Sequence, residues 1–109
     1  MWNEPTKEAL AKIPPLYSQD GEHTRDKIVH AHFFLAGMDW FITEFEGKDT
    51  FFGFAILFPS SGMAEWGHIS FQELKAIKAQ GAIEVDFDAH WTPRKVSEIP
   101  KIVEEGGCW

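Results

Sequence analysis

Residues 27–70 contain four runs that decide the fold, KIVHAHFFL (27–35), DWFITEFE (39–46), TFFGFAILF (50–58) and AEWGHIS (64–70). Each run is rich in β-branched and aromatic residues and is bounded by glycine, proline or polar residues, which is typical of β-strands. Parallel neighbours need a crossover of about a dozen residues, and the connections between these runs are much shorter. We therefore expect an antiparallel meander in which the four strands pair in sequence order.

A fifth strand is predicted over residues 83–91, because apolar and polar side chains alternate there without interruption. The apolar positions are Ile83, Val85, Phe87, Ala89 and Trp91, and the polar ones are Glu84, Asp86, Asp88 and His90. Successive side chains of a strand leave opposite faces of the sheet. One face of this strand should therefore meet the core and the other should meet water.

Two or three short helices are expected around this sheet. Residues 6–13 have apolar side chains at helical spacing and are followed by two prolines, which stop a helix. Residues 70–73 (SFQE) form a capping box, and Gly81 is placed to end the helix that follows. Residues 97–105 allow one or two helical turns with Pro100 near the start. The predicted fold class is α+β: a mainly antiparallel five-stranded sheet with two or three short helices.

Length and aromatic content indicate one domain over residues 1–109, because the chain is too short for two ordinary cores. Its 10 Phe and 5 Trp can fill a core without a disulfide or a structural metal. Both faces of the run at 50–58 are apolar. That strand is therefore either central and covered on both faces, or it exposes an apolar patch to a partner.

Charge and cysteine content exclude several classes of protein. The chain has 10 basic and 17 acidic residues, a net charge of -7, which repels a phosphate backbone and disfavours direct nucleic-acid binding. Cys108 has no second cysteine to pair with, which is typical of a reducing compartment. The N-terminus does not resemble a signal peptide, and the apolar run from Phe51 is far too short to span a membrane. We expect a cytoplasmic protein that does not contact membranes.

Several segments, taken in their order and spacing, resemble a known bacterial family. They are TKE (6–8) leading to IPPLY (13–17), WFITE (40–44), FFG (51–53), EWGHISFQEL (65–74), and IE (83–84) leading to DAHW (88–91). The family that they resemble is catalogued as domain of unknown function 2958, and its members are small single-domain proteins often found on plasmids, phages and other mobile elements. The resemblance implies a mobile-element context, and it carries over no catalytic residue, cofactor or ligand. We predict no cofactor.

His30 and His32 are the candidate metal ligands. They lie two residues apart on a predicted strand, so both imidazoles should leave the same face and could bind one metal ion. Further ligands would have to come from neighbouring strands, and the candidates are His68, His90, Glu44 and Asp88. The alternative is that these histidines are half-exposed residues of an ordinary sheet, bonded to water or to neighbouring polar groups.

Asp88 and His90 are the candidate catalytic residues, at the end of an acidic row that includes Glu84 and Asp86. Carboxylates on one face of a strand lie about 7 Å apart, a spacing that could hold a cation or flank a substrate. A histidine beside them could transfer a proton near neutral pH. The alternative is a solvated face that prevents edge pairing. A functional centre requires His30 or His32 to approach Asp88 or His90 within hydrogen-bonding distance.

The absence of nucleotide-binding, serine-hydrolase and zinc-protease motifs favours a protein that is not an enzyme. The aromatic residues exceed what so small a core needs, so some should form a binding surface, for which Trp40, Trp66, Glu84 and Asp86 are candidates. Our first interpretation is a protein-binding or accessory module, whose partner is another protein or a second copy. The alternative is a small metal-dependent hydrolase using the histidine and aspartate residues. An acidic inhibitor of DNA-handling proteins is a third hypothesis, although -7 is modest for a DNA mimic.

Overall fold

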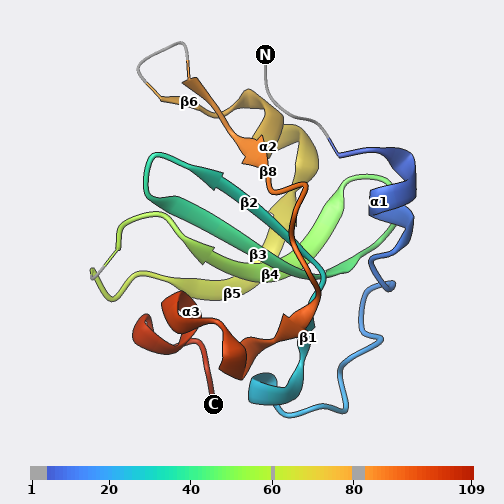
Figure 1. Ribbon diagram of the computed structural model, residues 1–109, viewed down its shortest axis with the longest axis vertical. Helices are drawn as coiled ribbons and strands as arrows, with labels where there is room; N and C mark the ends of the chain where they lie inside the picture. Colours follow the sequence, from blue (N-terminus) through green and yellow to red (C-terminus); the bar gives the residue numbers. More distant parts are fainter. Residues whose placement is uncertain (1–4, 60, 80–82) are drawn as a thin grey trace.

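The four strands predicted over residues 27–70 pair antiparallel in sequence order, as expected. The computed structural model describes residues 5–59, 61–79 and 83–109 (Figure 1). The strands of the meander are β2 (Ala31–Leu35), β3 (Met38–Phe45), β4 (Thr50–Ile56) and β5 (Glu65–Ser70). A short fifth strand, β8 (Asp86–Phe87), pairs with β2 and completes a sheet of order β5-β4-β3-β2-β8. The predicted α+β class with an antiparallel five-stranded sheet is confirmed.

Two of the predicted strands are divided into shorter pieces. The run at 27–35 breaks at His30, so β1 (Ile28–Val29) pairs with β9 (Arg94–Lys95) and not with the main sheet. The run at 83–91 forms β7 (Ile83–Glu84), paired with β6 (Lys78–Ala79), and then β8, and residues 89–90 form a turn. Alternation alone predicted one continuous strand. The division arises because the segments before and after Val85 pair with different neighbours, while Val85 itself is buried in the core.

One face of the sheet is covered by α1 (Lys7–Ala11) and α2 (Phe71–Ala76). Helix α1 begins at Thr6, whose hydroxyl accepts a hydrogen bond from the Ala9 N–H at 3.1 Å. The core on this face is strongly aromatic, and its buried residues are Ile13, Ala31, Phe33, Leu35, Trp40, Ile42, Phe45, Phe51, Phe71, Leu74 and Val85. The helix that follows β5 therefore packs on the sheet as predicted.

The opposite face is covered by the C-terminal segment, which contains β9, a 3-10 turn η2 (Val96–Glu98) and α3 (Pro100–Glu104). Pro100 occupies the first position of α3, where its missing N–H costs nothing. The buried residues on this face are Val29, Phe41, Phe54, Ile56, Val96, Ile99 and Ile102. Strand β4 is thus an inner strand covered on both faces, whereas Leu57 and Phe58, at the end of the predicted run, lie beyond β4 and are exposed.

Residues 106–109, which follow α3, are held against this second core. The Trp66 indole donates to the Gly107 carbonyl at 2.9 Å, and the Arg25 N–H donates to the Trp109 carbonyl at 3.0 Å. Cys108 is half-buried against the same core. Among the described residues, no helix has both the length and the apolar character needed to cross a bilayer.

Helix α2 begins with only half of the predicted capping box. The Ser70 hydroxyl accepts from the Glu73 N–H at 3.2 Å, as predicted. The other bonds come from Asp49, which accepts from the Ser70 hydroxyl at 2.8 Å and from the Gln72 N–H at 2.7 Å. The helix ends at Ala76 and β6 follows; Gly81, the predicted end, lies outside the described residues.

Ser70→Ala is expected to lower the free energy of unfolding by about 0.5–2 kcal/mol, because the helix loses its N-cap acceptor. Asp49→Ala should cost at least as much, because it removes the acceptor for Gln72 and the partner of Ser70. Urea unfolding followed by tryptophan fluorescence measures both. An unchanged midpoint for both variants would show that this network does not stabilise the helix start.

Candidate functional site

Four charged or titratable side chains from distant parts of the chain meet on the face covered by the C-terminal segment. The His32 Nε2 lies 2.7 Å from Asp39 Oδ1, and the His32 Nδ1 lies 3.3 Å from Asp88 Oδ2. The Lys101 Nζ donates to Asp39 Oδ2 at 2.8 Å. The imidazole is thus held between two carboxylates, one of which also binds a lysine.

Strand pairing brings these groups together. His32 lies opposite Phe41 in the β2–β3 register, and Asp39 lies opposite Phe34, so His32 and Asp39 are diagonal neighbours. On the other side of β2, the Asp88 N–H donates to the His32 carbonyl at 2.9 Å, immediately after β8. Lys101 comes from the first turn of α3. The site therefore joins both neighbours of β2 to the C-terminal helix.

Asp39 is the most buried member of the group, and its residue is only 2% exposed. Burial opposes ionisation of this carboxyl, but the hydrogen bonds from His32 and Lys101 outweigh burial, so the pKa of Asp39 lies below its ordinary value. Each carboxylate oxygen has one of these two donors. Asp39 is therefore ionised at neutral pH, and its two hydrogen-bonded partners compensate the cost of burying its charge.

Aromatic rings enclose His32. Its ring stacks on Phe41 with a centroid distance of 4.6 Å and an interplanar angle of 7°, and Phe34 and Trp91 lie at 5.5 and 5.1 Å. The Trp91 indole is held by a hydrogen bond to the Val29 carbonyl at 3.0 Å. The Arg94 guanidinium lies 4.2 Å above the Trp91 ring, a cation–π contact. These contacts restrict the orientation of the imidazole.

Two shallow hollows flank the network. One, of about 270 Å³, extends over Trp91, Arg94 and Pro100, and the other, of about 280 Å³, extends over Phe34 and Met38. His32, Asp39 and Lys101 line both hollows. The network thus lies where two open depressions adjoin.

The structure brings together two of the four predicted catalytic or metal-binding residues. His32 and Asp88 meet, as a functional centre would require. The backbone N–H of His30 donates a hydrogen bond to the Ile42 carbonyl. The His30 side chain is half-buried, and this burial lowers its pKa. His90 is exposed on the turn after β8, where its N–H donates to Asp88 Oδ1 at 3.1 Å. Within the described ranges, no three His, Cys, Asp or Glu side chains are arranged to hold a metal ion.

The predicted binding-surface residues are dispersed. Trp40 is buried in the core beneath α1 and α2, so it is not available to a partner. Trp66 is half-buried and packs on Phe54 at a centroid distance of 5.2 Å. Glu84 and Asp86 are half-buried and lie on different short strands.

Sequence reasoning did not find Asp39, Lys101 or the structural role of Glu44. Asp39 directly precedes the apolar residues 40–42 of β3, and an aspartate beside core residues usually has a partner, so this position carried a weak signal. Lys101 is 62 residues away in the chain, and no local pattern marks it. Glu44 accepts from the Tyr17 and Gln19 N–H groups at 2.8 and 3.0 Å and so anchors the loop after α1.

Large apolar side chains are exposed on the connection between β4 and β5. Leu57, Phe58 and Met63 are 43%, 61% and 69% exposed. The connection lies near the β2–β3 turn and α3, at the left of Figure 1, because Ile56 pairs with Asp39 and because Pro59 and Glu104 line a common depression. This end of the molecule is opposite the end that carries α1 (Figure 1).

A family model described as protein of unknown function (DUF2958) matches residues 6–107, so the chain belongs to this family. The resemblance found in the sequence is therefore confirmed. No curated protein matches the chain. No solved structure matches it either.

Proposed function

We propose that this member of the DUF2958 family is a non-enzymatic protein-binding module whose β4–β5 connection inserts into an apolar cleft of a partner protein. The observation that carries the proposal is the exposure of Leu57, Phe58 and Met63 on one connection. Exposed apolar groups of this size, gathered in one place, are typical of protein interaction sites. Both cores are complete without them, since neither core includes any of the three.

The charge around this connection supports a partner with basic groups beside its cleft. Glu65 begins β5 directly after the connection, and Glu104 is exposed on α3, which borders it. The whole chain has a net charge of -7. Complementary charge at the rim of an interface accelerates association and selects the partner. A second copy of this chain is a less favourable partner, because two acidic chains repel each other. The crosslinking experiment distinguishes the two cases.

A photo-crosslinking amino acid at position 58 is expected to link the protein to its partner, whereas the same group at position 17 should not. Tyr17 is 65% exposed and lies beside Glu44, at the other end of β3 from Asp39. With the purified partner, Phe58→Ser/Met63→Ser should raise the Kd by about tenfold or more, because apolar anchors dominate binding energy. Tyr17→Asn is the matched control and should leave the Kd unchanged.

Two outcomes would contradict the proposal. One is equal crosslinking from positions 58 and 17, and the other is a Kd that the Phe58→Ser/Met63→Ser variant does not change. A crosslink to a second copy, with a matching dimer in sedimentation, would replace the heterologous partner by self-association.

The resemblance to plasmid and phage proteins supports an accessory role on a mobile element. The single cysteine supports a location in the cytoplasm, a reducing compartment.

A small metal-dependent hydrolase is the alternative proposal, and the approach of His32 to Asp88 favours it. A metal ion there would have to replace a hydrogen bond from His32 to one of its two carboxylates. The test is hydrolysis of p-nitrophenyl esters and phosphodiesters with added Zn²⁺, together with a zinc titration monitored by Trp91 fluorescence. Activity lost in His32→Asn and kept in the exposed-site control His23→Asn would support it, and equal rates in both would exclude it.

A further inference from the structure

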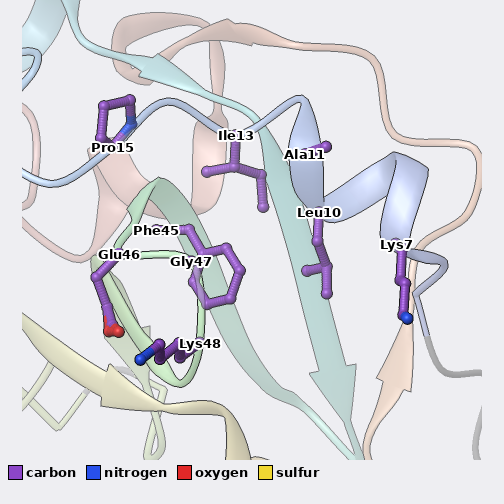
Figure 2. Close-up of a pocket in the computed structure, with 9 residues that line it drawn as sticks. All are labelled: Lys7, Leu10, Ala11, Ile13, Pro15, Phe45, Glu46, Gly47 and Lys48. Atoms are coloured by element: carbon purple, nitrogen blue, oxygen red, sulfur yellow. The ribbon is translucent and has the colours of Figure 1, made fainter.

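A hollow of about 550 Å³ lies between α1 and the β3–β4 turn (Figure 2). Its floor is apolar: Leu10 and Phe45 point into it, and Ile13 lies above them. Lys7 and Lys48 stand on opposite sides of this floor, with Glu46 beside Lys48 (Figure 2). The hollow is separate from the His32 network and from the β4–β5 connection.

Hydrogen bonds hold both walls of the hollow in place. The Phe45 N–H donates to the Pro14 carbonyl at 2.9 Å, which ties the segment after α1 to the end of β3. The Glu46 N–H donates to the Thr50 carbonyl at 2.9 Å and closes the β3–β4 turn, where Gly47 adopts a positive φ of 108°. Phe45 and Ile13 are buried core residues, so the floor belongs to the rigid part of the molecule. The hollow is therefore preformed.

The composition of the hollow selects a class of ligand. Small-molecule sites are typically concave, about 300–1,000 Å³ in volume and largely apolar, with a few polar groups that set orientation. Here the rim carries two lysines and one glutamate, a net charge of one positive unit on a chain that is otherwise acidic. A flexible ammonium binds an anionic group as a point charge.

We propose that this hollow binds a small amphipathic anion, with an apolar body of one or two rings or a medium alkyl chain and a single anionic head. The apolar body lies on Leu10, Ile13 and Phe45, and the head binds the ammonium group of Lys7 or of Lys48, which stand at opposite edges of this floor. Glu46 limits the charge of the ligand to one negative unit. Its carboxylate offsets the charge of one lysine and would repel a dianion. This site is independent of the proposed protein-binding function.

The probe for the experiment is 8-anilinonaphthalene-1-sulfonate, which has an aromatic body and one sulfonate, compared with N-phenyl-1-naphthylamine, which lacks the sulfonate. Wild type should bind the anionic probe more tightly than the neutral one. Lys7→Glu/Lys48→Glu should weaken binding of the anionic probe about tenfold or more and leave the neutral probe unchanged. Arg25→Glu/Lys95→Glu changes the net charge equally at two exposed positions that do not line the hollow, and it should have little effect. Thermal melts confirm that each variant is folded.

The position of the probe is established by amide chemical shifts, which should move in residues 7–15 and 45–48. Shifts confined to residues 57–63, or anionic-probe binding that is lost in Phe58→Ser/Met63→Ser, would overturn the site and leave the proposed protein-binding function standing. Equal weakening by both charge-reversal variants would also overturn it, because only net charge would then matter. Crosslinking from position 58 fails or succeeds independently of these results.

Discussion

Gly53→Ala should destabilise the protein by at least about 3 kcal/mol, because overpacking against a backbone atom cannot be relieved by a side-chain rotation. A Cβ atom at residue 53 would lie 2.1 Å from the Phe41 carbonyl oxygen, and at 3.1 Å it would also meet the Ile42 Cα. Both contacts are with the backbone of β3, the central strand. Strands β3 and β4 would have to separate in the middle of the sheet.

A β-bulge explains this close approach. The β3–β4 register shifts between Ile42 and Glu44, so Thr43 is the extra residue of β3, and its hydroxyl donates to the Phe52 carbonyl at 3.0 Å. A bulge bends and twists its strand, and here it brings the β3 backbone against Gly53.

Gly67→Ala is the matched control. Gly67 lies on β5, opposite Gly53 of β4, and a Cβ atom added to it would meet no atom within 4 Å. The control variant should be neutral or stabilising by up to about 1 kcal/mol, since alanine loses less backbone entropy in a strand. Urea unfolding followed by circular dichroism measures both variants. Equal midpoints for Gly53→Ala and Gly67→Ala would mean that β3 and β4 are not packed as described.

Asp39→Ala is the second large effect, with an expected loss of about 2–3 kcal/mol, because the change leaves His32 and Lys101 without their shared acceptor. The loss should also loosen α3, since the Lys101–Asp39 bond joins it to β3 beside the packing of Ile102 in the core. Amide exchange should therefore quicken in α3 (Pro100–Glu104) before it quickens in β3. Asp20→Ala, which removes an exposed aspartate, is the control and should change stability little.

The same variant predicts a pH dependence. Because the pKa of Asp39 is lowered in the folded state, the stability from its ionisation is present above about pH 4 and is lost as pH falls through the folded-state pKa. The free energies of unfolding of wild type and Asp39→Ala should therefore differ most between about pH 5 and 7. At about one pH unit above the unfolded-state pKa the carboxyl is almost fully ionised in both states. The two free energies of unfolding should begin to converge as pH falls below about 4, the unfolded-state pKa, and should meet below the folded-state pKa. A difference that is independent of pH would show that Asp39 acts by packing alone.

Local patterns predicted much of the fold. Turn residues and apolar runs indicated the meander, because connections of a few residues allow only antiparallel neighbours. The capping serine at residue 70 and the proline at residue 100 were placed correctly, because caps depend on residues within one helical turn. The boundaries near Val85 were not, since alternation shows which side a residue faces and does not show which strand pairs with it.

For the site, the sequence by itself indicated four candidates, His30, His32, Asp88 and His90, from their positions on predicted strands, and it did not show which of them would meet. Only the tertiary structure decided that Asp39 and Lys101 complete the network, because their meeting depends on α3 packing across the sheet. The hollow beside α1 likewise exists only after Pro14 bonds to Phe45. Periodicity and caps are local and can be read along the chain, whereas contacts between residues 62 apart depend on the packing of the whole domain.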